Sequence, residues 1–434
     1  MKKLYLLSVL FMLVLCLSSL THTAAAVTII EYENMFHEIL KNLRTNYWSP
    51  DGNWQGDWMY DAMALAPKAL YPYGIDMGDM DLINKANITV DRNIDLLFEL
   101  LRGGAIDFVE NLMGTYCTLE ALQFYSGEKY GNLPFEYVAW LTGVFTQGLI
   151  REVPNPAGDF LGYPFVMGSY AYSAIEYGSI VKGFFGFTAT WVALSIIETA
   201  NKNYWVEDSF IDVDYGYYWD NDPDHLWNEP MNSFVNGPML MALARAYGVT
   251  HDDEHLNKAD ALVRGANTRL WDQDRGGYAM HLDRPGRKLL ADNNSFILAL
   301  VELYNVTGQV TYLGRAREIL DFIENDLFME DQDHPGYFIC SHDWDNGYTN
   351  PSFCTGCNFA QLYSIYRLNQ LVQNGPIHPD LIGVCGQLPC DRTRVEDCLI
   401  YTGILLTPFL SIIWFGRRIR SKEACEENTC QCMC

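Results

Sequence analysis

The second half of the sequence repeats a pair of markers three times, and this repeat limits the folds open to the chain. Gly-Tyr pairs occur at 216–217, 277–278 and 336–337, in steps of 61 and 59 residues. A Ser-Phe pair follows each of them, at 233–234, 295–296 and 352–353. Two markers that keep nearly the same spacing through three copies predict a repeat architecture with one supersecondary unit per copy.

Each copy has the hydrophobic pattern of two helices. Segments such as 239–243 and 296–303 are apolar on nearly every face, which is typical of buried helices. Amphipathic segments follow at 253–271 and 311–328, with acidic residues near their start. Gly- and Asp-rich turns then lead into short extended pieces. One unit is therefore predicted to be an inner helix, an outer helix and a loop with a short strand.

The first half is less regular but is compatible with the same unit. It offers inner helices at 58–70, 114–124 and 182–199, and outer helices at 31–45, 90–101 and 135–150. Together with the second half, this makes six inner helices that begin about 59 residues apart. We predict an all-α fold, an (α/α)6 barrel or six-hairpin toroid, over residues 27–375. An open stack of hairpins is the alternative.

Two stretches of the second half resemble known families. Gly216-Tyr-Tyr-Trp-Asp followed by Asn232-Ser-Phe-Val-Asn-Gly-Pro-Met-Leu-Met-Ala-Leu-Ala is similar to the alpha-1,6-mannanase family. The run from Asn294 to Gln309, followed by Tyr312-Leu-Gly-Arg-Ala, is similar to that family and to N-acylglucosamine 2-epimerase-like proteins. The resemblance implies the six-hairpin glycosidase-like fold and a carbohydrate-active function. The mannanase family uses adjacent aspartates at a helix start, whereas Asp252-Asp253 here lies between an inner and an outer helix.

Both ends of the chain carry hydrophobic segments outside the toroid. Residues 1–26 have two lysines, an apolar stretch and a small-x-small site, which predicts a cleaved signal peptide. Residues 398–416 are apolar and are followed at once by arginines, which predicts a transmembrane helix with the tail, 417–434, inside. We expect a single-pass protein of the cell membrane with its N-terminal domain outside. The alternatives are an uncleaved anchor at the first segment and a buried core helix at the second.

The charge of the chain excludes one class of partner and favours another. The 54 Asp and Glu residues outnumber 29 Lys and Arg residues, so the surface repels phosphate backbones and no nucleic-acid partner is expected. Aromatic residues make up 14% of the chain, and aromatics with carboxylates suit a glycan or sugar substrate. No cofactor and no metal site is predicted.

Six cysteines lie in the predicted outer part, at 117, 340, 354, 357, 385 and 390. An even number in an oxidising compartment predicts disulfides. We expect Cys340 to pair with Cys354 or Cys357, and Cys385 to pair with Cys390 in the juxtamembrane linker, 376–397. A zinc site at Cys340, His342, Cys354 and Cys357 is the alternative. The tail cysteines have no specific spacing, and the sequons at Asn87, Asn293 and Asn305 are potential glycosylation sites.

The loops that lead into the inner helices should meet at one end of the ring and form a cleft. Acids in these loops suit glycoside hydrolysis, which needs one protonated and one ionised carboxyl group. The catalytic candidates are Asp57, Asp61, Asp220, Asp222, Glu229 and Asp292. The predicted substrate-binding residues are Trp54, Trp58, Trp219, Trp227, His225, His281, Asp283, His342, Trp344 and Asp345.

Two other functions stay open. Cleft histidines such as His281 and His342 could supply the acid and base of a sugar epimerase or isomerase. A non-catalytic glycan-binding, membrane-anchored protein would keep the ring without an acid pair. For any single aspartate, helix capping and turn formation are the competing explanation.

Overall fold

The computed structural model describes residues 27–56, 59–103, 164–180, 184–219, 231–330, 335–343 and 347–376. The predicted signal peptide, transmembrane helix and tail lie outside these residues, as do Cys385, Cys390 and nearly all of the linker. Within the described part of the chain, no helix is long and apolar enough to cross a membrane.

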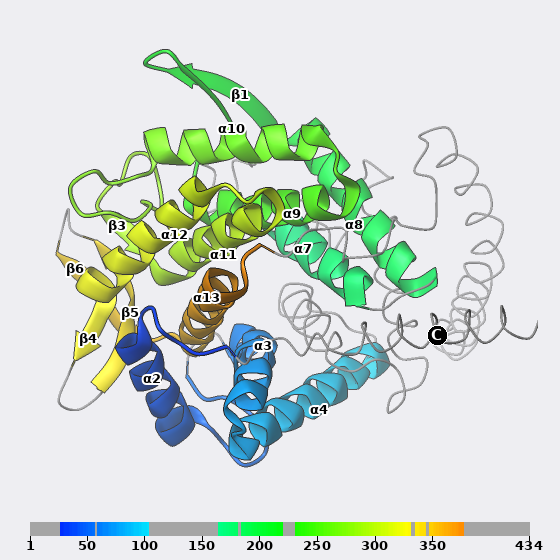
Figure 1. The fold of residues 1–434 in the computed structure, drawn as a ribbon, viewed down its shortest axis with the longest axis vertical. Coiled ribbons are helices and arrows are strands. Elements are labelled where there is room, and N and C mark those ends of the chain that lie inside the picture. Colours follow the sequence, from blue (N-terminus) through cyan, green and yellow to red (C-terminus); the bar gives the residue numbers. More distant parts are fainter. Residues whose placement is uncertain are drawn as a thin grey trace, which may run out of the picture.

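The described chain forms helical hairpins (Figure 1). From the second described hairpin onward, each inner helix packs against the next, and the last packs against the first. The inner helices are α3 (Met59–Met77), α7 (Pro164–Ile180), α9 (Ser233–Thr250), α11 (Leu290–Thr307) and α13 (Thr355–Asn374). The outer helices are α2 (Glu33–Asn42), α4 (Met80–Gly103), α8 (Phe184–Asn203), α10 (Asp253–Arg269) and α12 (Val310–Phe322). The predicted helices at 114–124 and 135–150 lie outside the described residues.

The last inner helix returns to the first, which favours a closed ring over an open stack. Helix α13 packs against α3, and α2 from the start of the chain packs against α13. The segment before α2 is fastened there too, because Asn369 Oδ1 accepts the backbone N–H groups of Ile30 and Glu31 at 2.9 Å. The Arg317 guanidinium on α12 also binds both carboxylate oxygens of Glu31 at 2.7 Å.

One predicted helix lies in the wrong layer. The segment 182–199 was expected to be an inner helix, but it forms α8, which packs outside α7. Helix α7 packs far more extensively against α9 than α8 does, so α7 is the inner member of this hairpin. Both helices are apolar on most faces, so the hydrophobic pattern could not tell which of them faces inward.

The fold also contains strands, so the prediction of an all-α chain is too simple. Strands β1 (Trp205–Phe210) and β2 (Val213–Tyr218) form an antiparallel hairpin that stands off the ring beside α10 (Figure 1). Strand β5 (Pro335–Asp343) pairs with β3 (Arg287–Leu289), β4 (Phe328–Glu330) and β6 (Tyr348–Phe353). All of these strands belong to the loops that connect an outer helix to the next inner helix. Five-residue π-helical turns, Leu43–Tyr47 and Ile323–Leu327, end α2 and α12.

The two sequence markers differ in structural meaning. Gly216 and Gly277 each lie directly before a buried tyrosine near the end of a connecting loop. A side chain at either position would clash with a neighbouring aromatic ring. A Cβ on Gly216 would lie 2.0 Å from the Trp205 ring, and one on Gly277, at φ +73°, would lie 2.4 Å from the Phe322 ring. The Ser-Phe pairs are not equivalent, because Ser233 begins α9, Ser295 is the sixth residue of α11, and Ser352 lies in β6.

The true register of the inner helices is set by an asparagine at the fourth residue. Each side chain donates from Nδ2 to the carbonyl of the residue that caps its helix, at 2.8 to 2.9 Å. We call these three residues the asparagine layer: Asn236 of α9, Asn293 of α11 and Asn358 of α13.

Two members of the asparagine layer also hold the chain segment that precedes their helix. Asn236 accepts from the backbone N–H of Tyr218 at 2.8 Å and donates to its carbonyl at 3.1 Å. Asn293 makes the same pair of bonds to Tyr278, at the same two distances. Both tyrosine hydroxyls donate to an asparagine of the preceding outer helix, Asn201 or Asn267. These contacts tie strand, outer helix and inner helix into one unit.

A second set of equivalent residues lies nine positions further along the same helices. It occupies the thirteenth residue of four inner helices, and at 1.5 Å per residue this is about 14 Å deeper in the ring. The signs alternate from helix to helix. We call this set, together with Lys68 of α3, the charge layer: Lys68, Glu176 of α7, Arg245 of α9, Glu302 of α11 and Arg367 of α13.

The charge layer is linked by ion pairs from one side of the described ring to the other. Lys68 Nζ donates to Glu176 Oε2. Arg245 Nη2 lies 3.2 Å from Glu176 Oε1 and 3.0 Å from Glu302 Oε1. Arg367 Nη2 lies 2.8 Å from the same Glu302 oxygen. Lone charges at this depth would be costly, but each carboxylate here has at least two cationic partners.

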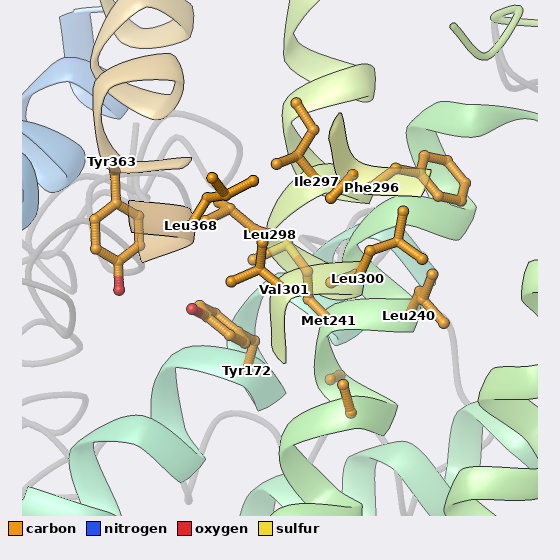
Figure 2. Close-up of a cluster of buried hydrophobic side chains, with 14 of the residues drawn as sticks. Tyr172, Leu240, Met241, Phe296, Ile297, Leu298, Leu300, Val301, Tyr363 and Leu368 are labelled. Atoms are coloured by element: carbon orange, nitrogen blue, oxygen red, sulfur yellow. The ribbon is translucent and has the colours of Figure 1, made fainter. Parts of the chain in front are cut away.

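The charges of this layer are surrounded by apolar and aromatic side chains. Figure 2 shows Leu240, Met241, Leu298 and Val301 converging from α9 and α11. The Lys68 ammonium lies 5.2 Å from the ring centroid of Tyr172 and 5.3 Å from that of Tyr363. Burial lowers the pKa of Lys68 to about 8, although Glu176 opposes the shift.

The structure corrects two predictions about modification. Cys354 and Cys357 form a disulfide with each other within the first turn of α13, so neither pairs with Cys340 and neither thiolate can bind zinc in this state. The sequon asparagines Asn293 and Asn305 are buried, with 0% and 4% exposure, so the folded chain offers neither as a glycosylation acceptor. Asn87 is half-buried and stays a predicted acceptor.

Candidate functional site

The candidate site lies where α9 and α11 begin, at the end of the ring where the connecting loops arrive. Asp292 is the third residue of α11, and its Oδ2 accepts a hydrogen bond from Ser233 Oγ at 2.5 Å. The Asp292 side chain is 2% exposed. The first turns of two neighbouring inner helices therefore share one buried carboxyl group.

The electrostatic setting of Asp292 makes it suitable for proton transfer. Burial raises the pKa of Asp292 to about 7, because the ionised form loses its hydration, while the Ser233 hydrogen bond and the charge of Arg287 oppose the shift. A carboxyl group with a pKa near neutrality exchanges a proton readily under physiological conditions. Among the predicted catalytic residues, Asp292 is the one whose surroundings the structure describes.

A histidine lies beside the start of α9. The backbone of His281 forms bridges with Asn232 and Arg284, and the N–H of Ser233 donates to the Met280 carbonyl at 3.1 Å. Burial lowers the pKa of His281 to about 4, against the opposing charge of Asp283. The imidazole is therefore neutral at pH 7. His281 and Asp292 are both in contact with the Asn232–Ser233 segment, one through the backbone and the other through its side chain.

Two phenylalanines add an aromatic surface near this point. Phe165 and Phe234 are the second residues of α7 and α9, and their rings stack with centroids 4.0 Å apart and planes 16° apart. Both are half-buried. Sequence reasoning used Phe234 only as a repeat marker and missed Phe165, Asn232 and Ser233 as site residues. Their common signal is that they cap or begin an inner helix.

Several predicted substrate-binding residues have other roles. Trp54 is completely buried, with its ring against Trp48 and Phe359 at 4.8 and 4.6 Å, and its Nε1 donates to Thr89 Oγ1 at 3.0 Å. Its indole faces the core and cannot stack on a sugar at the rim, so this prediction is wrong. Trp219 follows β2 and is half-buried against the core.

The two predicted histidines come from different connecting loops. His342 lies in β5, opposite Lys288 of β3 and Thr349 of β6, whereas His281 lies in the loop before β3. Asp283 is exposed in that loop. Asp61 lies in the first described turn of α3, near the loop end of that inner helix. The remaining candidates lie outside the described residues: Asp57, Trp58, Asp220, Asp222, His225, Trp227, Glu229, Trp344 and Asp345.

Comparisons with known proteins show the fold but no close relative. No known family profile matches this sequence. No curated protein matches it either. Among solved structures, a GH76 alpha-mannanase from Bacteroides thetaiotaomicron matches with a TM-score of 0.54 and 12% identity, over 80% of this chain and 97% of its own.

Two further solved structures have the same arrangement. A D-mannose isomerase matches with a TM-score of 0.52 and 12% identity, over 77% of this chain and 96% of its own. An unsaturated glucuronyl hydrolase specific for heparin matches with a TM-score of 0.51 and 14% identity, over 78% and 96%. The predicted similarity to six-hairpin glycosidase-like proteins is therefore confirmed at the level of the fold.

Proposed function

We propose that this chain is a carbohydrate-active enzyme, a glycoside hydrolase that uses Asp292 as its general acid. The observation that carries the proposal is the buried carboxyl group of Asp292, whose pKa is raised to about 7 at the loop end of an inner helix. Protonation of a glycosidic oxygen needs such a group, because an ordinary carboxyl group is ionised at neutral pH. The shared fold with glycoside hydrolases supports the proposal.

The reaction needs a second, ionised carboxylate as base or nucleophile. We assign this role to Asp61, because it lies near the start of α3, another inner helix of the ring. Helices α3 and α11 both pack against α13, so the two positions flank the same helix at the same end of the ring. The stacked pair Phe165 and Phe234 would bind the apolar face of a sugar.

The test compares two aspartates of the same region. The full-length chain is incubated with a panel of neutral and acidic oligosaccharides, and products are separated by chromatography. Asp292→Asn should lower kcat by about 10²- to 10⁴-fold, the usual contribution of a general acid. The control Asp274→Asn, at an exposed carboxylate eighteen positions earlier in the turn after α10, should stay near wild type. Equal activity in both variants would remove Asp292 from the mechanism.

A sugar isomerase is the second candidate, and His281 favours it. Its imidazole is buried and neutral beside the segment that binds Asp292, so it could take a proton while Asp292 donates one. A D-mannose isomerase shares the fold. Incorporation of deuterium from solvent at a sugar carbon, abolished by His281→Gln, would identify this reaction. Cleavage products without such exchange would identify the hydrolase.

We also propose an extracytoplasmic location, on the sequence features of the two chain ends. A signal peptide at 1–26 and a transmembrane helix at 398–416 would leave the ring outside and the basic tail, 417–434, inside. Protease added to intact cells should digest the ring and leave an epitope in the tail protected. Protection of the ring instead would contradict the proposed orientation.

A further inference from the structure

A groove lies between the β1–β2 hairpin and the outer helix α10. Figure 1 shows this hairpin standing off the ring beside α10. Its volume is about 750 Å³, which is within the range of binding sites for small molecules and sugar units. The hairpin contributes Trp205, Asp214 and Tyr215, and α10 contributes Glu254, Asn257 and Lys258. None of these residues belongs to the candidate site at the start of α9 and α11.

The groove has a rigid aromatic wall. Trp205 packs closely over Gly216, where a Cβ would lie only 2.0 Å from the indole, and its ring meets the edge of Tyr218 at 5.1 Å. Trp205 is nevertheless half-exposed toward the groove. Because the ring is already fixed by the protein, a ligand that stacks on it loses little side-chain entropy.

The polar groups around the indole are suited to hydroxyl groups. The Tyr215 hydroxyl donates to Asp208 at 3.1 Å, and this bond fixes the orientation of both groups in the lining of the groove. The side chains of Asp214, Glu254 and Asn257 make no hydrogen bond to other residues of the described chain. An amide and several carboxylates around one aromatic ring offer both donors and acceptors to a chain of hydroxyl groups.

The charge of the groove restricts its ligand. Four carboxylates, of Glu207, Asp208, Asp214 and Glu254, face two cations, of Lys258 and Arg264. This excess of two negative charges repels uronates and sulfated sugars. A basic ligand is disfavoured for a different reason: the Lys258 ammonium already lies 4.5 Å from the Trp205 ring centroid. A ligand cation would have to replace a like charge there, whereas a neutral sugar only displaces a flexible side chain.

We propose that this groove is a docking site for uncharged glycan chains, separate from the candidate active site and independent of the reaction catalysed there. The pyranose ring would stack on Trp205, and its hydroxyl groups would bind Tyr215, Glu254 and Asn257. Such a site would keep a polymeric or surface-bound glycan beside the ring while another part of the chain enters it.

Hydrogen–deuterium exchange measures binding at this groove directly. The full-length chain is kept in a detergent without a sugar headgroup and exposed to mannohexaose, cellohexaose or chitohexaose as neutral probes. At least one of them should protect the peptides spanning 205–218 and 253–269. Hexagalacturonate, as the acidic probe, and hexalysine, as the basic probe, should leave both peptides unprotected. Protection by either charged probe alone, or by none of the five, would overturn the proposal.

Variants on the exposed face of α10 then localise the contact. Glu254→Ala with Asn257→Ala should weaken neutral-glycan binding at least about 10-fold, the loss expected for two polar contacts at roughly 1 kcal/mol each. The matched control, Asp253→Ala, removes a neighbouring carboxylate that does not line the groove and should bind as wild type. Equal affinity in the double variant and the control would also overturn the proposal. If glycan still protects the groove peptides from exchange in Asp292→Asn, binding at the groove does not depend on the proposed catalytic role of Asp292.

Discussion

The asparagine layer and the charge layer share α9, α11 and α13, yet they stabilise different contacts. At the fourth residue, Asn236, Asn293 and Asn358 repeat one side chain, because each must satisfy the same backbone groups at a helix start. At the thirteenth residue the side chains must instead satisfy one another across the ring. They therefore alternate in sign, from Glu176 to Arg367.

This difference shows why equivalent positions of a structural repeat are not always recognisable from the sequence. A layer that binds the backbone is similar from copy to copy, so like residues recur at equivalent positions. A layer that closes on itself through ion pairs needs unlike residues at equivalent positions. In the asparagine layer, Asn236 and Asn293 dock their helices onto the preceding connecting loop, whereas the charge layer joins successive hairpins. Removing members of each should therefore have distinct costs.

The largest effect is expected from the charge layer. Glu302→Gln removes the carboxylate that binds both Arg245 and Arg367, so that Arg367 loses its carboxylate partner and Arg245 keeps Glu176 alone. The free energy of unfolding should fall by about 3–5 kcal/mol, as it does when one partner of a buried ion pair is lost. Urea unfolding followed by circular dichroism measures the change.

The control for that experiment is Glu318→Gln on α12. The Glu318 side chain is 56% exposed, and within the described part of the chain its ion pair is with Arg315 of the same helix. Its loss should therefore change stability by less than about 0.5 kcal/mol. If the two variants unfold alike, the ion pairs of the charge layer do not hold the inner helices together.

A smaller effect is expected from the asparagine layer. Asn293→Ala leaves the N–H and C=O groups of Tyr278 and the carbonyl of Leu289 without their buried partner. We expect a loss of about 2 kcal/mol, which is the usual cost of stranded buried polar groups. Thermal unfolding measures it, with Asn325→Ala as the exposed control. A loss as large as that of Glu302→Gln would erase the distinction between the two layers.

The ring could be predicted from sequence because its cause is repeated in the sequence. Buried helices recur at nearly constant spacing, and Gly216 and Gly277 recur because close packing against Trp205 and Phe322 excludes any other residue. The charge layer could not be predicted in this way, since Arg245 and Glu302 are opposites at equivalent positions. The sequence also could not show which of α7 and α8 is the inner helix, because both are apolar on most faces.

The candidate site was only partly predictable. Asp292 was selected from its place before a buried helix, and the structure adds the burial and the Ser233 hydrogen bond that adjust its pKa. Trp54 was selected by residue type, but residue type does not distinguish a rim tryptophan from a core tryptophan. Its partners, Phe359 among them, are distant in sequence, so only the closed ring reveals their contact.

The smallest predicted effect is a pair of opposed pH dependences at the candidate site. The pKa of Asp292 is raised to about 7, so the folded state holds a proton that the unfolded state releases above pH 4, and stability falls as pH rises toward 7. The pKa of His281 is lowered to about 4, so the unfolded state binds a proton first, and stability falls as pH drops below 6.5. Between pH 5 and 6.5 the two contributions oppose each other.

Single substitutions should separate these contributions. Relative to wild type, Asp292→Asn should make stability rise more steeply with pH, and His281→Gln should make it fall, each by about 1 kcal/mol per pH unit in this window. Urea unfolding at pH 5.0, 5.5, 6.0 and 6.5 measures the slopes, and the differences from wild type cancel the titration of other groups. Glu302→Gln should leave the slope in this window unchanged, because the pKa of Glu302 is lowered and its titration lies at more acidic pH. Parallel curves for Asp292→Asn and His281→Gln would show that neither group titrates abnormally, and the proton-transfer role of Asp292 would lose its physical basis.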